Sequence, residues 1–221
     1  MMEVMATYQI TEKTEEMAAI EAITPVELRG RWVYFAAKRV LDLFFALVGL
    51  VALAIPMALI ALIIAIDSPG KPIFRQKRMG KNGRVFTILK FRTMYTYAPH
   101  DVATNSLDTA SYTTKVGEFL RVYSLDELPQ LWNVLIGNMS LVGYRPVCLS
   151  EQRLNQLREE YGILATKPGI TGYAQVNGRD NVTTDEKVRL DLYYVKHCSV
   201  LLDLRCILKT AKVALSKEGA K

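Results

Sequence analysis

The chain has 221 residues, of which 50% are hydrophobic, and a formal net charge of +6 at neutral pH. This length provides one globular domain beside a membrane segment, and the apolar content is sufficient for a core. Two scattered histidines, three cysteines without a CxxC spacing and the absence of Walker or GxGxxG motifs argue against zinc sites, disulfide frameworks and the common nucleotide-binding folds. The cysteines instead indicate reduced thiols in a cytosolic domain.

Residues 1–30 form a polar, acidic extension in which glutamates outnumber basic residues. Its acidity is unlike the charge of a secretory signal peptide, so we expect none there. No function is assigned to this extension.

Residues 43–66 form an uncharged run of 24 residues that contains Pro56. As a straight helix the run would be about 36 Å long, enough to cross a bilayer core of about 30 Å. Basic residues flank both of its ends, however, and a single crossing would place one cluster on the wrong side of the membrane. The clusters are Arg29, Arg31, Lys38 and Arg39 before the run, and Lys71, Arg75, Lys77, Arg78, Lys81 and Arg84 after it.

A helix broken at Pro56 would keep both basic clusters in the cytosol. Proline lacks an N–H group and clashes with the carbonyl of Ala52, and each half of the run then has the length of a re-entrant segment. We therefore expect residues 31–67 to be a re-entrant membrane anchor. An ordinary tilted span with a proline kink is the alternative.

Residues 68–221 are expected to form a cytosolic domain that begins with a basic stretch. Residues 71–92 contain eight basic residues and no acidic one, which favours anionic headgroups, a phosphorylated substrate or both. Nucleic acid is disfavoured because the stretch adjoins an apolar anchor and no nucleic-acid module is recognised. Residues 84–91 predict a short strand after a turn at 81–83.

Helices are predicted farther along the chain, after a polar stretch at residues 95–114 that suits a lid or a disordered loop equally well. The last helical pattern has one apolar face, which suits either the membrane surface or the domain core. The predicted helices cover residues 116–122, 130–135, 150–161, 185–196 and 200–215.

Two adjacent carboxylates, Asp126 and Glu127, directly precede a helix predicted to begin at Pro129. This position is a helix pole that attracts anions. Ser124 and Glu127 also have the spacing of a capping box, but such a helix would carry Pro129 in its second turn, where it costs a backbone hydrogen bond. The proline therefore shifts the interpretation toward a functional pair.

Glycines and basic residues surround the carboxylate pair in sequence. Arg121 precedes it and Arg145 follows it between Gly143 and Pro146, and guanidinium groups bind phosphate bidentately while glycine lets backbone approach a ligand. The loop 167–172, with Gln175 and Arg179, adds polar groups. The dipeptide at 177–178 is Asn-Gly, a strong turn signal that favours a β-hairpin there, and both interpretations can hold together.

Taken together, these blocks resemble the bacterial sugar transferases, the monotopic phosphoglycosyl transferases that start glycan assembly on a polyprenol carrier. The resemblance extends from about residue 34 to residue 215. The chain departs from the family's usual pattern at Tyr144, where a proline is common, and at Ile55, where a serine often precedes the proline of the break. It rests on Lys38-Arg39-x-x-Asp42, Lys90-Phe91-Arg92-Thr93-Met94, Asp126-Glu127 through Gly143, Lys167-Pro168-Gly169-Ile170-Thr171-Gly172 and Asp191-Leu192-Tyr193-Tyr194.

The resemblance implies roles for particular residues. Asp126 would be the nucleophile that attacks the sugar-proximal phosphate of a UDP-sugar and displaces UMP, and polyprenyl phosphate would then take the phosphosugar from it. Glu127 would join Asp126 in coordinating Mg²⁺, which offsets the diphosphate charge. The substrate-binding set comprises Lys90, Arg92, Arg121, Arg145, Gln175 and Arg179.

The expected protein is a predominantly helical α+β monotopic enzyme on the cytoplasmic face of the bacterial inner membrane. Its implied partners are the UDP-sugar, undecaprenyl phosphate and membrane lipids, without nucleic acid, and a homodimer is left open. Its product would initiate an exopolysaccharide, O-antigen or glycoprotein glycan. The alternative is a non-catalytic membrane scaffold, which would account for the basic cluster but not for the paired carboxylates.

Overall fold

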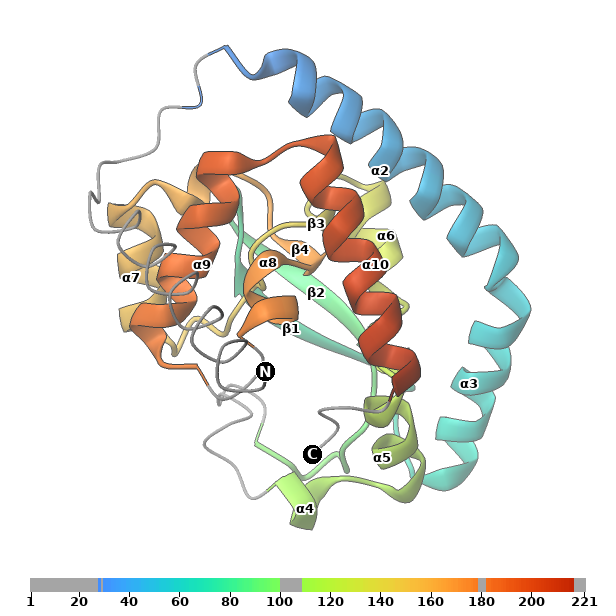
Figure 1. Ribbon diagram of the computed structural model, residues 1–221. Coiled ribbons are helices and arrows are strands. Elements are labelled where there is room, and N and C mark those ends of the chain that lie inside the picture. The colour runs from blue at the N-terminus through green and yellow to red at the C-terminus, as the bar shows by residue number, and fades with distance from the viewer. Residues whose placement is uncertain (1–27, 29, 100–108, 179–181, 217–221) are drawn as a thin grey trace, which may run out of the picture.

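The computed structural model describes residues 28, 30–99, 109–178 and 182–216, with only the backbone at 109 and 213–216. Two small sheets lie among the helices (Figure 1). Strands β1 (Ile73–Met79) and β2 (Val85–Phe91) pair antiparallel, and β3 (Ser140–Val142) pairs parallel with β4 (Gly169–Thr171). The predicted α+β class with a helical majority is confirmed, and so is the strand at 84–91.

The predicted helices are all present in this part of the chain, with ends within two residues of the expected ones. Short 3₁₀ turns lie at Lys81–Gly83 (η1), which joins β1 to β2, at Leu125–Glu127 (η3) and at Ile163–Ala165 (η4). The helices are α2 (Trp32–Ala52), α3 (Ala54–Asp67), α4 (Thr109–Tyr112), α5 (Lys115–Val122), α6 (Gln130–Leu135), α7 (Gln152–Glu160), α8 (Tyr173–Asn177), α9 (Thr184–His197) and α10 (Val200–Ser216).

Helices α2 and α3 follow one another along one side of the molecule and are bent by 61° (Figure 1). Within the described residues, no single helix has the length and hydropathy of a membrane span, whereas this bent pair has both when taken together, as a broken span or a re-entrant loop would. The break falls at Leu53, three residues before the predicted position. Pro56 then occupies the first turn of α3, where a missing N–H costs little.

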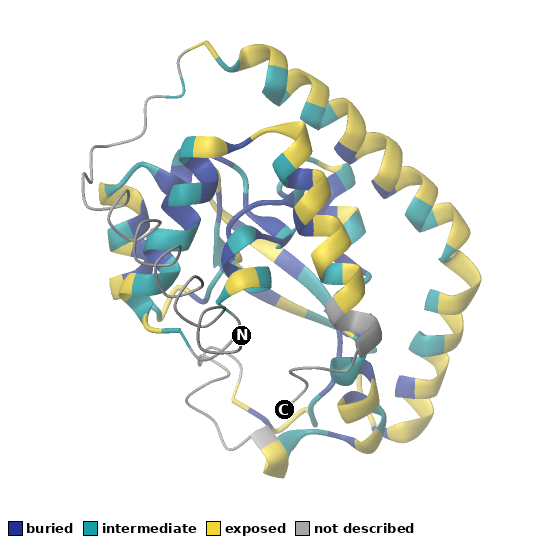
Figure 2. Ribbon diagram, viewed as in Figure 1, coloured by how far each residue is buried: buried dark blue, intermediate teal, exposed yellow. Residues whose placement is uncertain are grey.

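Much of α2 and α3 is exposed (Figure 2), and the exposed side chains include many large apolar ones. Trp32, Ile55 and Ile66 are 75–78% exposed, whereas Ala46 and Ile64 face the domain and are buried. A continuous exposed apolar surface of this kind marks a contact with another apolar phase or protein.

Three charged side chains hold α2 against the domain. Lys38 forms an ion pair of 2.7 Å with Asp203 of α10, and Arg39 donates hydrogen bonds to two carbonyls at the end of α6. The buried Asp42 accepts hydrogen bonds from the hydroxyl of Ser140 and the amide of the next residue in β3. The charged motif before the apolar run therefore fixes the position of α2.

The β-hairpin interpretation of residues 177–178 is wrong. Residues 173–177 form the short helix α8, and Gly178 continues it by donating its amide to the carbonyl of Ala174. A two-residue hairpin with an Asn-Gly turn needs positive φ angles, but Gly178 has a φ of −105°. Strand β4 instead finds its partner in β3.

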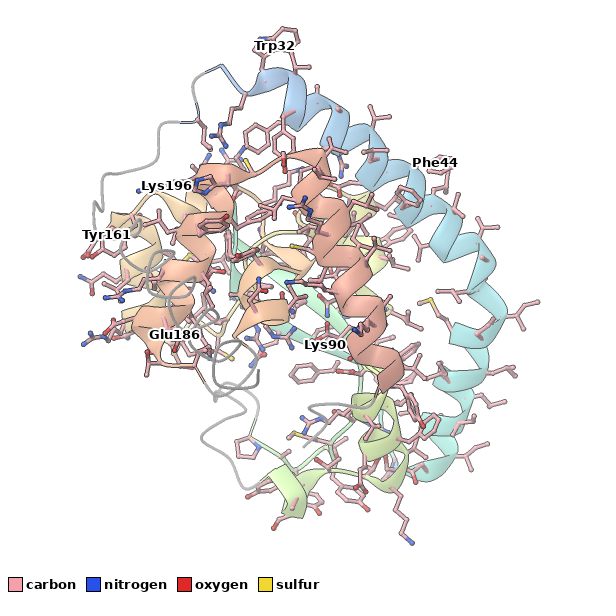
Figure 3. The ribbon with its side chains drawn as sticks, viewed as in Figure 1. Trp32, Phe44, Lys90, Tyr161, Glu186 and Lys196 are labelled. Carbon is pink, nitrogen blue, oxygen red and sulfur yellow. The ribbon has the colours of Figure 1, made fainter. Side chains whose placement is uncertain are left out.

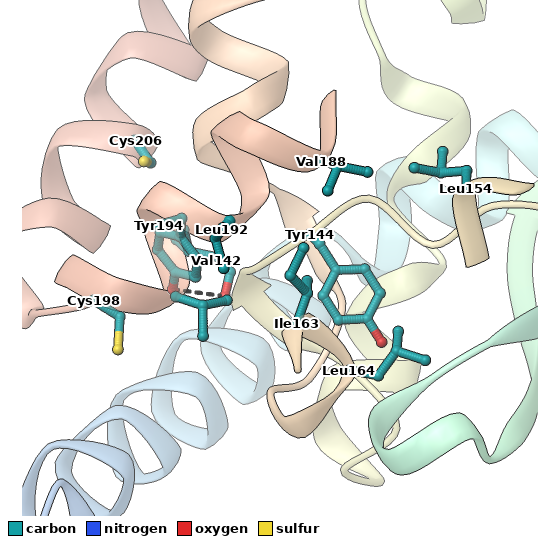
Figure 4. Close-up of a cluster of buried hydrophobic side chains, with 11 residues drawn as sticks. Val142, Tyr144, Leu154, Ile163, Leu164, Val188, Leu192, Tyr194, Cys198 and Cys206 are labelled. Atoms are coloured by element: carbon teal, nitrogen blue, oxygen red, sulfur yellow. Dashed lines mark hydrogen bonds between the residues drawn. The ribbon is translucent and has the colours of Figure 1, made fainter. Parts of the chain in front are cut away.

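The largest buried cluster packs α7, α9 and α10 against β3 and the loop that follows it (Figure 4). Tyr144 and Ile163 lie in its centre, and the hydroxyl of Tyr194 donates to the carbonyl of Val142 at 3.2 Å (Figure 4). This core supports the loop that carries Arg145.

Candidate active site

Asp126 and Glu127 lie in the 3₁₀ turn η3, between α5 and α6. The turn begins at Ser124, whose φ of 54° is left-handed, and the Ser124 side chain accepts no capping hydrogen bond. The capping-box alternative is therefore wrong. The turn leaves both carboxylates available to side chains from other elements.

Glu127 forms ion pairs with two cations. Its Oε1 lies 2.7 Å from the Nζ of Lys90, near the end of β2, and 2.8 Å from an Nη of Arg145 (Lys90 is labelled in Figure 3). Burial alone would raise the pKa of Glu127, but the charges and hydrogen bonds of Arg145 and Lys90 lower it to about 2. Glu127 is therefore ionised at neutral pH.

Asp126 has a different environment. It is 8% exposed, its Oδ2 lies 3.8 Å from the Nζ of Lys90, and no described side chain donates a hydrogen bond to it. Burial raises the pKa of Asp126 above its ordinary value, against the lowering effect of Lys90. Glu127 raises this pKa further, while Arg145 and Arg121 lower it. The site thus combines a buried carboxylate, to which no described residue donates a hydrogen bond, with three surrounding cations.

Arg121 approaches this site from α5. Its Nε donates to the hydroxyl of Thr93 at 3.1 Å and an Nη donates to that of Thr113 at 3.4 Å. Burial lowers the pKa of Arg121, and the charge of Asp126 raises it. The helix lies close to Thr93 because α5 has Gly117 there, where a Cβ would fall 2.0 Å from the Thr93 carbonyl oxygen.

Two further arginines hold the loop of Arg145, and the sequence interpretation missed both roles. Arg158 is buried with Asp191, and one Nη donates to the carbonyl of Arg145 at 2.9 Å. Arg78 in β1 donates to the carbonyl of Pro146 at 3.3 Å. Arg78 belongs to the basic stretch that was interpreted by charge alone, and only the folded chain gives it this partner.

The helix that follows the carboxylates is joined to the strand that carries Lys90. Asn133 of α6 is buried. Its side-chain oxygen accepts a hydrogen bond from the backbone N–H of Leu89 at 3.0 Å, and its side-chain nitrogen donates one to the carbonyl of Thr87 at 2.8 Å. In the sequence, the signal available for this contact was a polar residue within a largely apolar helical segment. This pair of hydrogen bonds fixes η3 relative to β2.

The glycines near the site bring backbone segments together. A Cβ at Gly143 would fall 2.3 Å from the Lys167 carbonyl, and one at Gly172 would meet the carbonyl of Gly143. The predicted close approach is therefore present, but the partner is the protein's own backbone instead of a ligand. This packing sets the distance between the Arg145 loop and β4.

Two residues of the predicted substrate-binding set have other partners than the carboxylates, and a third has no described position. Arg92 is buried and donates to the carbonyls of Ile64, Ser68 and Pro69, so it caps the end of α3. Gln175 donates to the carbonyl of Ile170 and makes no described contact with either carboxylate. The remaining residue, Arg179, lies outside the described residues.

The described residues contain no group of three or more His, Cys, Asp or Glu side chains arranged for a metal ion. Asp126 and Glu127 are nevertheless suitable for Mg²⁺, because this ion commonly binds one or two carboxylates together with substrate phosphates and water. Among the described residues, these two neighbouring carboxylates are the ones whose chemistry fits the ion.

Residues 33–217 match the family model described as bacterial sugar transferase. The chain is 41% identical over 205 residues to "Galactosyl transferase CpsE" of Streptococcus agalactiae serotype III, covering 86% of this chain and 45% of that protein. It is 43% identical over 194 residues to "Undecaprenyl-phosphate glucose phosphotransferase" of Komagataeibacter xylinus, covering 83% of this chain and 36% of that protein. It is 38% identical over 205 residues to "UDP-glucose:undecaprenyl-phosphate glucose-1-phosphate transferase" of Escherichia coli K12, covering 90% of this chain and 44% of that protein.

The match covers most of the chain and includes the carboxylate pair, so the chain belongs to the bacterial sugar transferase family. It spans less than half the length of these three relatives.

Proposed function

We propose that this chain transfers a sugar 1-phosphate from a UDP-sugar to polyprenyl phosphate, with Asp126 as the nucleophile. The observation that carries the proposal is a buried carboxylate that receives no hydrogen bond from the described residues and lies among Lys90, Arg121 and Arg145. A free carboxylate suits nucleophilic attack, and the cations suit a diphosphate substrate.

In the first step a carboxylate oxygen of Asp126 bonds to the sugar-proximal phosphorus. The bond from that phosphorus to the bridging oxygen breaks, and UMP leaves with the electron pair. In the second step an oxygen of polyprenyl phosphate bonds to the same phosphorus and displaces the carboxylate. The products are polyprenyl diphosphate sugar and the regenerated Asp126.

The ionisation state of Glu127 supports its proposed role. Glu127 is held ionised by its two cations, so it contributes fixed negative charge for Mg²⁺. Bound there, the metal would offset the charge of the donor diphosphate. Arg145 is 47% exposed, which gives its guanidinium room to turn from Glu127 toward an incoming phosphate.

The location that fits this reaction is the cytoplasmic face of the inner membrane, with α2 and α3 as a re-entrant anchor. The bend of 61° and the exposed apolar surface support this part of the proposal. An anchor of this kind would let one site meet a soluble nucleotide sugar and a lipid-borne acceptor.

The test is UMP release by the purified protein with undecaprenyl phosphate and a panel of UDP-sugars. Mass spectrometry of the protein after exposure to donor alone should detect a phosphosugar adduct. Asp126→Asn should abolish both signals, and the matched control Asp185→Asn, which changes an exposed carboxylate of α9, should retain them. Full turnover by Asp126→Asn would contradict the nucleophile assignment.

A non-catalytic membrane scaffold remains the rival function. It predicts no UMP release with any donor of the panel and no adduct on Asp126, while membrane association is retained. The same assay therefore separates the two functions.

A further inference from the structure

A second group of basic side chains lies at the turn of the β1–β2 hairpin. Lys81, Arg84 and Lys167 line a cavity of about 470 Å³, together with residues that include Gly137 and Asn138. We call it the hairpin-turn cavity. Its volume lies within the range of about 300–1,000 Å³ that is typical of small-molecule sites.

This cavity is separate from the carboxylate pair. In the hairpin, Val85 pairs with Met79 beside the turn, whereas Lys90 pairs with Phe74 near the other end. Arg84 and Lys90 are six residues apart along extended chain, which corresponds to about 20 Å. A ligand at the hairpin turn would therefore not occupy the carboxylate site.

None of the three cations forms an ion pair with a carboxylate in the described part of the chain. No described ion pair or side-chain hydrogen bond involves Lys81, Arg84 or Lys167, although each faces the same cavity. The nearby carboxylate of Asp42 is occupied by hydrogen bonds from β3. Glu159 lies outside the cavity lining, with its Oε1 3.8 Å from the position of a Cβ on Gly83.

The positive charges are also crowded. A Cβ on Gly137 would lie 3.3 Å from an Nη of Arg39 and 3.6 Å from the Nζ of Lys167, so both cations flank this glycine. Burial lowers the pKa of Lys167, Arg39 and Lys81 lower it further, and Asp42 partly opposes them. Arg39 donates hydrogen bonds to carbonyls of α6, so the cations that could contact a ligand in the cavity are Lys81, Arg84 and Lys167.

We propose that the hairpin-turn cavity binds a phosphate group of a second ligand. Arg84 supplies paired N–H donors for phosphate oxygens, and Lys81 and Lys167 supply point charges. Three cations match a multiply charged phosphate better than a single carboxylate. A phospholipid headgroup and a soluble phosphate share this chemistry. The inference does not depend on the proposed transferase activity.

The test compares two triple variants of the full chain purified in detergent. One carries Lys81→Gln, Arg84→Gln and Lys167→Gln. The control removes the same numbers of lysines and arginines at exposed positions outside the cavity, through Arg75→Gln, Lys77→Gln and Lys115→Gln.

Inorganic pyrophosphate is the soluble probe, measured by calorimetry, and phosphatidylglycerol is the lipid probe, measured by native mass spectrometry. The cavity variant should bind at least one probe roughly tenfold more weakly than the control variant does, as expected for loss of charge-assisted hydrogen bonds. A loss confined to pyrophosphate identifies a soluble phosphate ligand, and a loss that includes phosphatidylglycerol identifies a headgroup.

Thermal unfolding provides a second measurement. Pyrophosphate should raise the melting temperature of the control variant more than that of the cavity variant. If the triple cavity variant does not fold, the double variant Lys81→Gln/Arg84→Gln replaces it, because both side chains are exposed. Equal binding of both probes by the cavity and control variants would overturn the proposal.

Discussion

The buried ion pair behind the Arg145 loop gives a quantitative prediction. Arg158 and Asp191 are each 2% exposed, with N···O distances of 3.0 and 2.6 Å. The Arg158 guanidinium also lies 4.9 Å from the ring centre of Tyr144. Replacing Arg158 with methionine therefore leaves a buried carboxylate unpaired and removes a donor from the Arg145 carbonyl.

Breaking a buried pair by removing one partner costs about 3–5 kcal/mol. For a domain of this size, each kcal/mol lowers the melting temperature by about 2–4 °C, so Arg158→Met should lower it by about 6–20 °C. The matched control is Arg153→Met, which breaks a pair whose side chains are 75% and 63% exposed and should change stability by less than about 1 kcal/mol.

The loss of folding stability caused by Arg158→Met should also depend on pH. Burial raises the pKa of Asp191 even beside Arg158, and losing that cation raises it further. A carboxyl group whose pKa is higher in the folded state than in the unfolded state is disfavoured in its charged form in the core. The protein therefore loses folding stability as the pH rises from the unfolded-state pKa through the folded-state pKa of that group. The deficit should therefore be largest at neutral pH and shrink as the pH falls.

The assay is thermal or urea unfolding of both variants across this pH range. The double variant Arg158→Met/Asp191→Leu should recover most of the lost stability, because two apolar side chains replace the pair without leaving a buried charge. A loss below about 1 kcal/mol in Arg158→Met, or the same loss at every pH, would refute this reasoning.

Three further predictions concern the site and the anchor. Lys90→Gln should move the acid limb of the pH–activity profile to higher pH, because the charge of Lys90 lowers the pKa of Asp126; an unmoved limb would contradict this. Chelation should stop UMP release and Mg²⁺ should restore it, with a weaker response in Glu127→Gln; turnover that survives exhaustive chelation would exclude the metal role. Cysteines introduced at Trp32 and at Lys71, in a background without native cysteines, should both be labelled only from the cytosol, and labelling of either from outside would reject the re-entrant anchor.

Five helices and the strand at 84–91 could be predicted because their signals are local. Apolar periodicity located α5, α6, α7, α9 and α10, and the turn at 81–83 located the strand after it. The carboxylate pair was also identifiable, since Pro129 argued against a simple cap and the neighbouring blocks resembled a known family.

Other local signals were misleading where long-range contacts prevailed. The Asn177-Gly178 dipeptide favours a hairpin, but β3 supplied the partner of β4 and left α8 to form in its place. Arg92 lies in a motif that resembles a phosphate-binding block, yet carbonyls at the end of α3 occupy its guanidinium. Neither outcome is encoded in the few residues around it.

The sequence by itself determined most of the longer helices, where the charges cluster and which family the chain resembles. Only the tertiary structure decided that Arg158 and Arg78 hold the Arg145 loop and that Lys81 and Lys167 share a cavity. The physical reason is distance along the chain: backbone geometry and periodicity act over a few residues, whereas these partners meet only after the core has packed.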